Sequence, residues 1–209
     1  MTNFLSFLLH VGQLKRTYRV GWLVTGLSKD LRVESIAEHS FRVAMMAMCF
    51  TSSSEFKTLD RQRCVEMAMI HDLAESIIGD LCPFDDQQII QRKPQLELEA
   101  MQRICGMLPD AKLAEYVMEL FTEFEEKQTD EALAVKDCDL LDMIMQACEY
   151  ELLGNQKSDL KKSFTRDSVL NKLTNQWAKD HARKFIDSVD AGVAKLPKDS
   201  NTETYYKFN

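Results

Sequence analysis

The sequence is poor in the residues that interrupt helices. It has only seven glycines and four prolines in 209 residues, and runs of alternating β-branched side chains are absent. Strands and hairpins depend on such runs and on turn residues between them. The sequence therefore predicts an all-α fold.

Long runs of one kind of residue are also missing. The net charge is −7, and no stripe of Arg and Lys alternates with aromatics, so binding to polymeric nucleic acid or to an anionic membrane surface is disfavoured. No stretch approaches the ~18 apolar residues of a membrane span. The N-terminus "MTNFLSFLLHVGQLKR" does not read as a secretory signal, because its basic residues follow the short apolar run. An anionic ligand would thus need a metal ion or a few placed arginines.

The cysteines form no C-x-x-C pair, and most stand beside Met, Ala or Leu in helix-like patterns. This usage predicts buried free thiols in a reducing compartment, most simply the cytoplasm, with the nucleus as the alternative. The six residues are Cys49, Cys64, Cys82, Cys105, Cys138 and Cys148.

Apolar spacings of three and four predict helices at about residues 4–18, 36–50, 59–78, 95–107, 110–126, 130–153 and 166–190. We expect one domain over residues 1–195, with a core at about 4–155, an additional C-terminal helix at about 166–190, and a mobile tail at 196–209. The first helix has one apolar face, made by Phe4, Phe7, Leu8, Val11 and Leu14. Seven methionines in helical patterns are expected in the core: Met45, Met46, Met48, Met67, Met69, Met143 and Met145.

The stretch "MAMIHDLAESIIGD" places polar side chains where a buried helix face is expected. His71 interrupts the apolar pattern, Asp72 is adjacent, and Glu75 lies four residues after His71, so an α-helix would bring all three to neighbouring positions. A mixture of imidazole and carboxylate suits Mn, Fe, Co, Ni, Zn or Mg without selecting among them. The plain alternative is a core histidine with satisfied ring nitrogens.

One helix cannot complete a coordination sphere, so further ligands should come from other helices. His39 opens another apolar segment, "EHSFRVAMMAMCF". The segment "AVKDCDLLDMIMQACEYE" offers Asp137, Asp139 and Asp142. Burial inferred from spacing does not choose among these aspartates, and together they could equally form a polar helix face.

These segments resemble the H…HD…D signature of the HD-domain metal-dependent phosphohydrolases. The stretches "ESIAEHSFRVAMMAM", "HDLAESIIGDLCPFD" and "AVKDCDLLDMIMQACEYE" are similar to the subgroup of 5′-deoxynucleotidases. The resemblance implies a single helical HD domain. It also implies a first metal ion on His39, His71, Asp72 and Asp139, the last matching the family's K-x-x-D segment.

The resemblance assigns further roles near the metal. Glu75 and Asp80 are implied as catalytic groups or as ligands of a possible second ion, to which the backbone of Leu81 contributes. Arg19 matches the arginine expected to bind the substrate phosphate. Two positions depart from the family's pattern: Leu140, where relatives often have Lys or Gln, and Asp142, where Glu is usual. Trp22, near Arg19, is expected either to line the pocket or to anchor the fold.

The implied activity is hydrolysis of a deoxynucleoside 5′-monophosphate to a deoxynucleoside and phosphate, with a divalent ion such as Mn, Co, Mg or Zn. In this reading Glu75 accepts a proton from the attacking water and Asp80 protonates the leaving oxygen, although the reverse fits equally. The alternatives are an HD-domain phosphohydrolase of another nucleotide substrate and a metal-stabilised interaction module without catalysis. Homodimers are common among members of the family, and we expect one here.

Overall fold

The structure is a computed structural model, and it describes residues 3–24, 26–52, 56, 58–83, 85–155 and 169–197. These residues contain no strand. An isolated antiparallel bridge joins Tyr18 to Ser35. The prediction of an all-α fold is therefore confirmed. The helices are α1 (Asn3–Gln13), α2 (Val20–Val24), α3 (Ile36–Phe50), α4 (Arg61–Ile70), α5 (Glu75–Ile78), α6 (Gln87–Cys105), α7 (Ala111–Glu126), α8 (Asp130–Leu152) and α11 (Gln176–Asp190).

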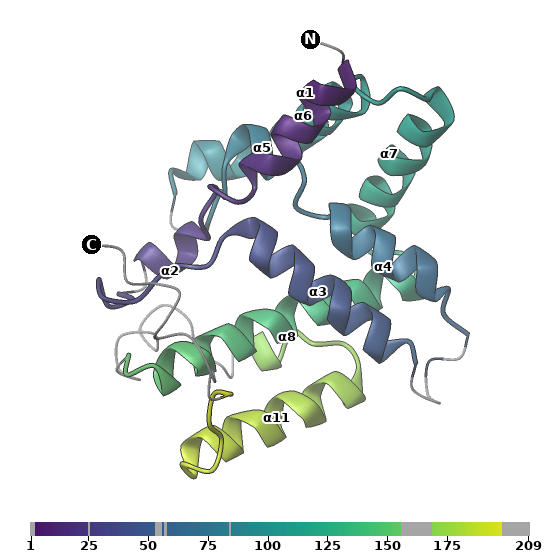
Figure 1. The fold of residues 1–209 in the computed structure, drawn as a ribbon. Coiled ribbons are helices and arrows are strands. Elements are labelled where there is room, and N and C mark those ends of the chain that lie inside the picture. The colour runs from purple at the N-terminus through teal and green to yellow at the C-terminus, as the bar shows by residue number, and fades with distance from the viewer. Residues whose placement is uncertain are drawn as a thin grey trace.

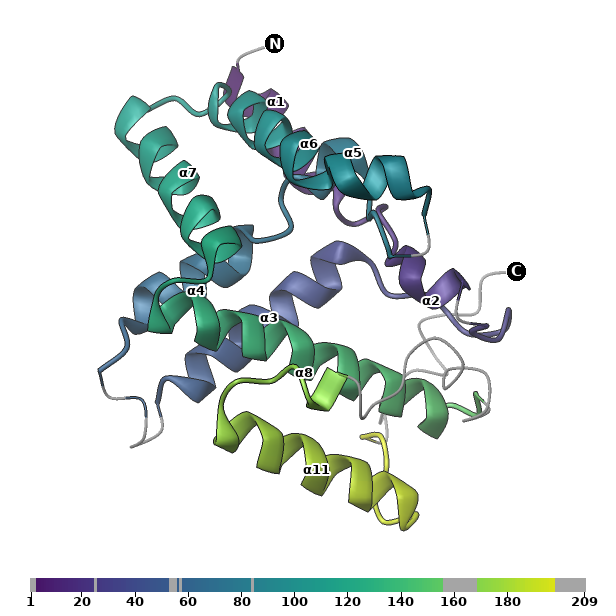
Figure 2. The ribbon, with the colours of Figure 1, turned by 180° about the vertical axis from the view of Figure 1, so that it is seen from behind.

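The helices form two groups, one made by α3, α4, α8 and α11 and the other by α1, α5 and α6. Helix α3 packs against both α4 and α8, and α11 lies along the other side of α8 (Figures 1 and 2). Helices α1, α5 and α6 lie together at the opposite end, and α7 packs against α6 as well as against α4 and α8. The larger core cluster contains Val43 and Phe50 of α3, Met67 of α4 and Ile144 of α8. The faces that α3, α4 and α8 turn toward each other are therefore largely fixed by apolar burial.

Side-chain caps set where the central helices begin. Ser35 and Glu38 form a reciprocal capping box at the start of α3, which satisfies two backbone donors that helix geometry leaves free. Asp60 caps α4, and Thr129 caps α8. The start of α3 is thereby fixed one turn before His39.

The helix expected over residues 59–78 is in fact two helices, so that prediction is wrong. Helix α4 ends at Ile70, and the chain continues through a turn with hydrogen bonds of the i to i+3 kind, such as Leu73 N to Ile70 O at 2.9 Å. His71 Nδ1 donates to the carbonyl of Ala68 at 2.7 Å. An uninterrupted helix would offer that carbonyl to the amide of Asp72, so the imidazole replaces a helical bond at the point where the helix ends.

Other boundaries also differ from those expected. Helix α1 ends at Gln13 rather than near residue 18, and α2 was not predicted. The fourth predicted helix begins eight residues earlier, at Gln87, and passes through Pro94. Asp86 caps its first turn, and this cap lets the helix start upstream of the proline. The C-terminal helix predicted at 166–190 begins later, at Gln176, because residues 171–175 are not helical. Residues 166–168 of that prediction and 198–209 of the predicted tail lie outside the described residues.

The predicted burial of the methionines is wrong at three positions, since Met45, Met48 and Met69 are exposed. The apolar face of the first helix is mostly open: Phe4 is 46% exposed and Leu8 46%, while Leu14 beyond the helix end is buried. Five cysteines are buried free thiols as expected, whereas Cys49 is an exposed free thiol. Helical spacing identifies an apolar face without identifying a neighbour that covers it.

None of the helices in the described ranges has the length and hydropathy of a membrane span.

Asp137 joins α8 to the segment that begins α11. Its buried carboxylate accepts hydrogen bonds from the backbone and hydroxyl of Thr174, at 2.8 and 3.0 Å, and from the backbone of Asn175, at 2.7 Å. Asn175 in turn caps α11 through the amide of Trp177. This aspartate therefore has a structural role, and its side chain points to α11.

Replacing Asp137 by Asn is expected to lower the free energy of unfolding by about 2 kcal/mol. One carboxylate oxygen becomes an NH2 group, which cannot accept hydrogen bonds from Thr174 and Asn175. The melting temperature should fall by about 4–8 °C. Asp187 of α11 is exposed, and Asp187→Asn should stay within about 0.5 kcal/mol of the parent. Thermal unfolding followed by circular dichroism measures both, and equal melting temperatures would contradict this role of Asp137.

Candidate metal centre

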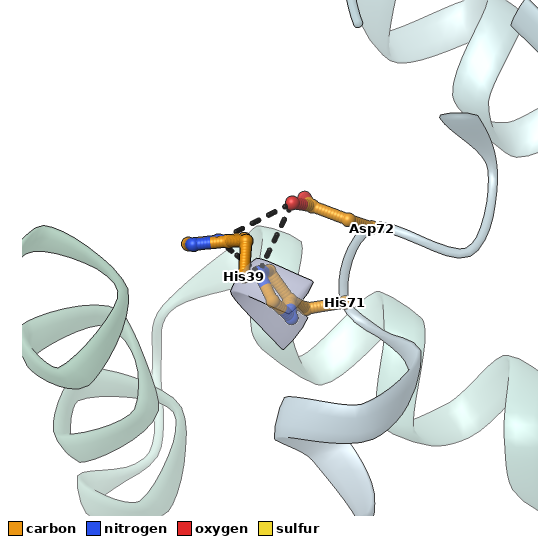
Figure 3. Close-up of side chains that lie close together, drawn as sticks. All are labelled: His39, His71 and Asp72. Carbon is orange, nitrogen blue, oxygen red and sulfur yellow. Dashed lines mark hydrogen bonds and ion pairs between the residues drawn. The ribbon is translucent and has the colours of Figure 1, made fainter. Parts of the chain in front are cut away.

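Four polar side chains from three separate parts of the chain meet beside the core. His39 projects from α3, His71 and Asp72 from the turn after α4, and Asp139 from α8. His39 Nε2 lies 3.3 Å from His71 Nε2, 3.3 Å from Asp139 Oδ1 and 3.5 Å from Asp72 Oδ2. Figure 3 shows the two imidazoles and Asp72 converging. The structure thus brings His39, His71 and Asp72 close enough to share one ion, and Asp139, the fourth residue implied as a ligand, joins them through its contact with His39.

The other ring nitrogens fix which atoms face the centre. His39 Nδ1 lies 2.8 Å from Asp142 Oδ2, and His71 Nδ1 lies 2.7 Å from the carbonyl of Ala68. Both partners are acceptors, so each Nδ1 carries a proton and donates. Each Nε2 therefore faces the centre, where it can bind a metal ion once it carries no proton.

The spacing of the donor atoms fits a divalent ion. With bonds of about 2.1 Å to nitrogen and oxygen, neighbouring ligand atoms in a tetrahedral or octahedral sphere lie about 3.0–3.4 Å apart. The separations of 3.3–3.5 Å between His39 Nε2 and its three neighbours, and of 3.3 Å between His71 Nε2 and Asp72 Oδ2, are close to that range. Two imidazoles and two carboxylates form a mixed donor set that suits borderline metals.

The centre also holds its carboxylates in the ionised form that a metal needs. Burial opposes ionisation of Asp72, but His71, His39 and Arg19 outweigh it and hold the pKa of Asp72 well below its usual range. Burial likewise opposes ionisation of Asp139, and Lys136 and His39 lower its pKa.

For His39, burial and Arg19 favour the neutral ring, yet hydrogen bonds to Asp139 and Asp142 raise its pKa to about 9. Because a metal ion at Nε2 must displace the proton there, metal binding should release protons.

A second layer of polar groups supports His39. Arg42 donates through Nε to Asp142 and through Nη1 to Glu149 at 2.7 Å, and its Nη2 donates to Gln146 at 2.8 Å. Glu34, His39 and Asp142 are close enough to share an ion as well. However, the guanidinium of Arg42 already supplies positive charge there, bonded to Asp142 and 3.9 Å from Glu34. We therefore interpret these groups as support for His39.

Trp22 belongs to this supporting layer. Its side chain is buried, its indole donates to Glu34 at 2.8 Å, and its ring packs edge-on against Tyr150 with centroids 5.4 Å apart. The Tyr150 hydroxyl accepts the backbone N–H of Glu34. Of the two roles expected for Trp22, these contacts favour the structural anchor.

Arg19 lies at the rim of the centre. Its Nη1 is 3.4 Å from Asp72 Oδ2 and its Nε is 3.8 Å from Glu34 Oε1. Its backbone N–H donates to the carbonyl of Glu34. The short segment before α2 is thereby tied to the segment before α3, and this pairing brings an N-terminal arginine next to the turn that follows α4.

Glu75 and Asp80, the two groups implied as catalytic, have different partners. Glu75 is buried, one carboxylate oxygen has no hydrogen-bond partner, and burial together with Asp72 and Asp80 raises its pKa well above the usual value. Asp80 Oδ2 accepts the backbone N–H of Val20 at 2.6 Å. Among the residues that the structure describes, no group of three His, Cys, Asp or Glu side chains positioned to share an ion includes Glu75 or Asp80.

Two lysines near the centre have no role assigned from the sequence, although the first, Lys136, begins the K-x-x-D segment. Lys136 Nζ lies 2.7 Å from Asp139 Oδ2 and 5.6 Å from the ring centre of Phe124. Lys93, from α6, donates to the carbonyl of Leu81 at 3.1 Å and lies 3.9 Å from Glu75 Oε1. The spacing of Lys136, three residues before Asp139, was a usable signal. Lys93 has no such signal, because only the packing of α5 against α6 brings it here.

Comparison with known proteins places this centre in a family. Residues 11–181 match the HD domain family. The human protein named 5′-deoxynucleotidase HDDC2 is 38% identical over 173 residues, covering 83% of this chain and 79% of its own. The 5′-deoxynucleotidase hdd1 of Schizosaccharomyces pombe is 36% identical over 182 residues, covering 85% of this chain and 88% of its own.

A solved structure has the same arrangement of helices. A conserved hypothetical protein from Pyrococcus furiosus superposes with a TM-score of 0.65 at 33% sequence identity, over 90% of this chain and 99% of its own. The family match covers residues 11–181, which include every residue that we place at the centre, and the sequence relatives span most of the chain. The chain therefore belongs to the HD-domain family of phosphohydrolases.

Proposed function

We propose that this protein is a metal-dependent 5′-deoxynucleotidase, which hydrolyses deoxynucleoside 5′-monophosphates to deoxynucleosides and phosphate. The observation that carries the proposal is the convergence of His39 Nε2, His71 Nε2, Asp72 and Asp139 beneath the guanidinium of Arg19. Relatives with 36–38% identity carry the name of this activity. The proposed ligands of the first ion are these two histidines and two aspartates.

A divalent ion held there would lower the pKa of a bound water and neutralise charge on the phosphoryl oxygens. The donor set suits Mn, Co, Zn or Mg, and the choice among them depends on supply as well as on ligand type. Arg19 presents a planar pair of donors suited to two phosphate oxygens. It also accounts for anion binding by a chain of net charge −7.

Glu75 is the proposed general base. Its buried carboxylate keeps one oxygen without a partner, and burial together with Asp72 and Asp80 raises its pKa, which favours its uptake of a proton. Protonation of the leaving oxygen remains the proposed role of Asp80. The bond from Val20 to Asp80 suggests an additional role, because it fixes the residue directly after Arg19. Asp80 would then help to orient the phosphate-binding guanidinium.

The same features weigh against the alternatives. An interaction module stabilised by a metal needs the four ligands, but it needs neither a buried carboxylate with an unpartnered oxygen nor an arginine at the rim. Another nucleotide substrate for the same scaffold is a closer rival, and the substrate panel below separates the two. We further propose a cytoplasmic homodimer, on the basis of the family resemblance and of the five buried free cysteines.

Metal-stripped protein supplied with Mn, Co, Mg or Zn singly should release phosphate from 5′-deoxynucleoside monophosphates. His71→Ala should lose this activity by at least about 10³-fold, because it removes a ligand of the ion. His181 is exposed and stacks on Trp177 away from the centre, so His181→Ala should remain active. The measurement is phosphate release from a panel of deoxy- and ribonucleoside 5′-monophosphates.

Two outcomes of this panel would count against the proposal. Release only from ribonucleotides or diesters would favour another HD-domain substrate. No release with any metal, in protein whose melting temperature the metal raises, would favour the interaction module.

Asp142→Asn should weaken Mn²⁺ binding by about 10- to 100-fold, because it removes the charge that orients the His39 ring. Asp137→Asn, the same substitution on the same helix, should lower stability and leave Mn²⁺ affinity unchanged. Asp142→Glu restores the residue type usual in the family and should bind Mn²⁺ within a few-fold of the parent. Titration of Mn²⁺ by calorimetry measures all three, and equal affinities for the two Asn variants would refute the orienting role.

Glu75→Gln should reduce turnover by about 10²- to 10⁴-fold, because the amide cannot accept a proton. The first ion should still bind, since Glu75 does not contact it. Glu99 is exposed on α6, and Glu99→Gln provides the matched control. Turnover and Mn²⁺ affinity are measured on the same preparations, and a fully active Glu75→Gln protein would remove Glu75 from the mechanism.

A further inference from the structure

Lys93 reaches the groups that the family resemblance assigns to a second ion. Its Nζ lies 3.1 Å from the carbonyl oxygen of Leu81, 3.9 Å from Glu75 Oε1 and 3.5 Å from Glu97 Oε1. The lysine comes from α6, whereas Glu75 opens α5 and Leu81 follows it. The contact therefore depends on tertiary packing and not on local sequence.

The surroundings keep Lys93 positively charged. Burial disfavours its ammonium form, but Glu97, Glu75, Asp72 and Asp80 outweigh burial and raise its pKa. The side chain is 30% exposed, compared with 5% for that of Glu75. The ammonium of Lys93 thus places a positive charge 3.9 Å from the otherwise buried carboxylate of Glu75.

The three groups implied as second-ion ligands are each engaged by N–H groups of the protein. Lys93 contacts Glu75 and the Leu81 carbonyl, and the amide of Val20 donates to Asp80. A divalent ion bound to the same oxygens would lie within a few ångströms of the ammonium, where like charges in a partly buried site repel strongly. The ion and the lysine therefore compete for this position.

We propose that the ammonium of Lys93 acts as the built-in cation at this position, so that the protein binds one divalent ion tightly and a second only when Lys93 is displaced. The proposal rests on the proposed function for its assignment of Glu75 to the reacting centre. In this arrangement Lys93 balances the charge of Glu75 without closing off its unpartnered oxygen. Lys93 is then a positioning residue for Glu75, and the first ion remains with its four separate ligands.

The test counts Mn²⁺ ions bound per chain, from the electron paramagnetic resonance signal of free Mn²⁺ during titration of the metal-stripped protein. The wild-type chain should bind one ion tightly and a second at least about 100-fold more weakly. Lys93→Gln should bind the second ion at least about 10-fold more tightly than wild type does. Lys93→Arg keeps the charge and should resemble wild type, as should Arg92→Gln at the neighbouring exposed position.

A double variant, Lys93→Gln with Glu75→Gln, should lose the tightened second ion, which shows that the ion uses the oxygens released by the lysine. Two equally tight ions in wild type would overturn the proposal, and so would an unchanged second affinity in folded Lys93→Gln. The wild-type count alone can overturn the proposal, even if the variants fail to fold.

This test is separate from the test of the proposed function. One tight ion in wild type and a tightened second ion in Lys93→Gln, without phosphate release, would indicate that the nucleotidase assignment fails. Two equally tight ions in a protein that releases phosphate would indicate that only the role of Lys93 fails.

Discussion

The site depends on the hydrogen bonds made by the Nδ1 atoms of its two histidines. Asp142 and the carbonyl of Ala68 each accept a proton from one ring, and these bonds leave both Nε2 atoms facing one point. A ring free to rotate would offer its nitrogen in many directions, and much of the binding energy of an ion would be lost in orienting it. The end of α4 follows from the same constraint, because the Ala68 carbonyl bonds to the imidazole of His71. The turn that results carries Asp72 toward His39 and sets Glu75 at the start of a new helix.

Charge balance is the second constraint, since burial makes the site costly unless each carboxylate has a cationic neighbour. Arg19 and Lys136 flank Asp72 and Asp139, and Arg42 neutralises the outer layer behind His39. Glu75 has weaker compensation, since the ammonium of Lys93 lies 3.9 Å away and one oxygen has no partner. The least balanced carboxylate is therefore the one best suited to take up a proton during the reaction.

Much of this arrangement could be predicted from the sequence, because buried histidines beside carboxylates stand out in apolar helices. The four proposed ligands and Arg19 follow from the family resemblance and not from spacing. Apolar spacing predicts an unbroken helix through His71. It does not show that the His71 imidazole would bond to the backbone carbonyl of Ala68. Lys93 and Arg42 were missed because their partners lie far away in sequence, at residues 75, 81, 142 and 149. The exposed Met45, Met48 and Met69 are predicted in the core because helical spacing does not show which faces find neighbours.

The aspartates of α8 show how far helix geometry can take such an inference. At about 100° per residue, Asp139 and Asp142 point about 60° apart, whereas Asp137 points about 160° away from Asp139. Geometry therefore groups the first two and separates the third, but it does not say which group faces the histidines. Packing of α8 against α3 determines which group faces the histidines, because it brings Asp139 to Nε2 of His39 and Asp142 to Nδ1. Asp137 then faces α11, where it accepts three hydrogen bonds. One helix thus supplies a proposed ligand, the support of another ligand, and an anchor for the C-terminal helix, and each role follows from the direction of one side chain.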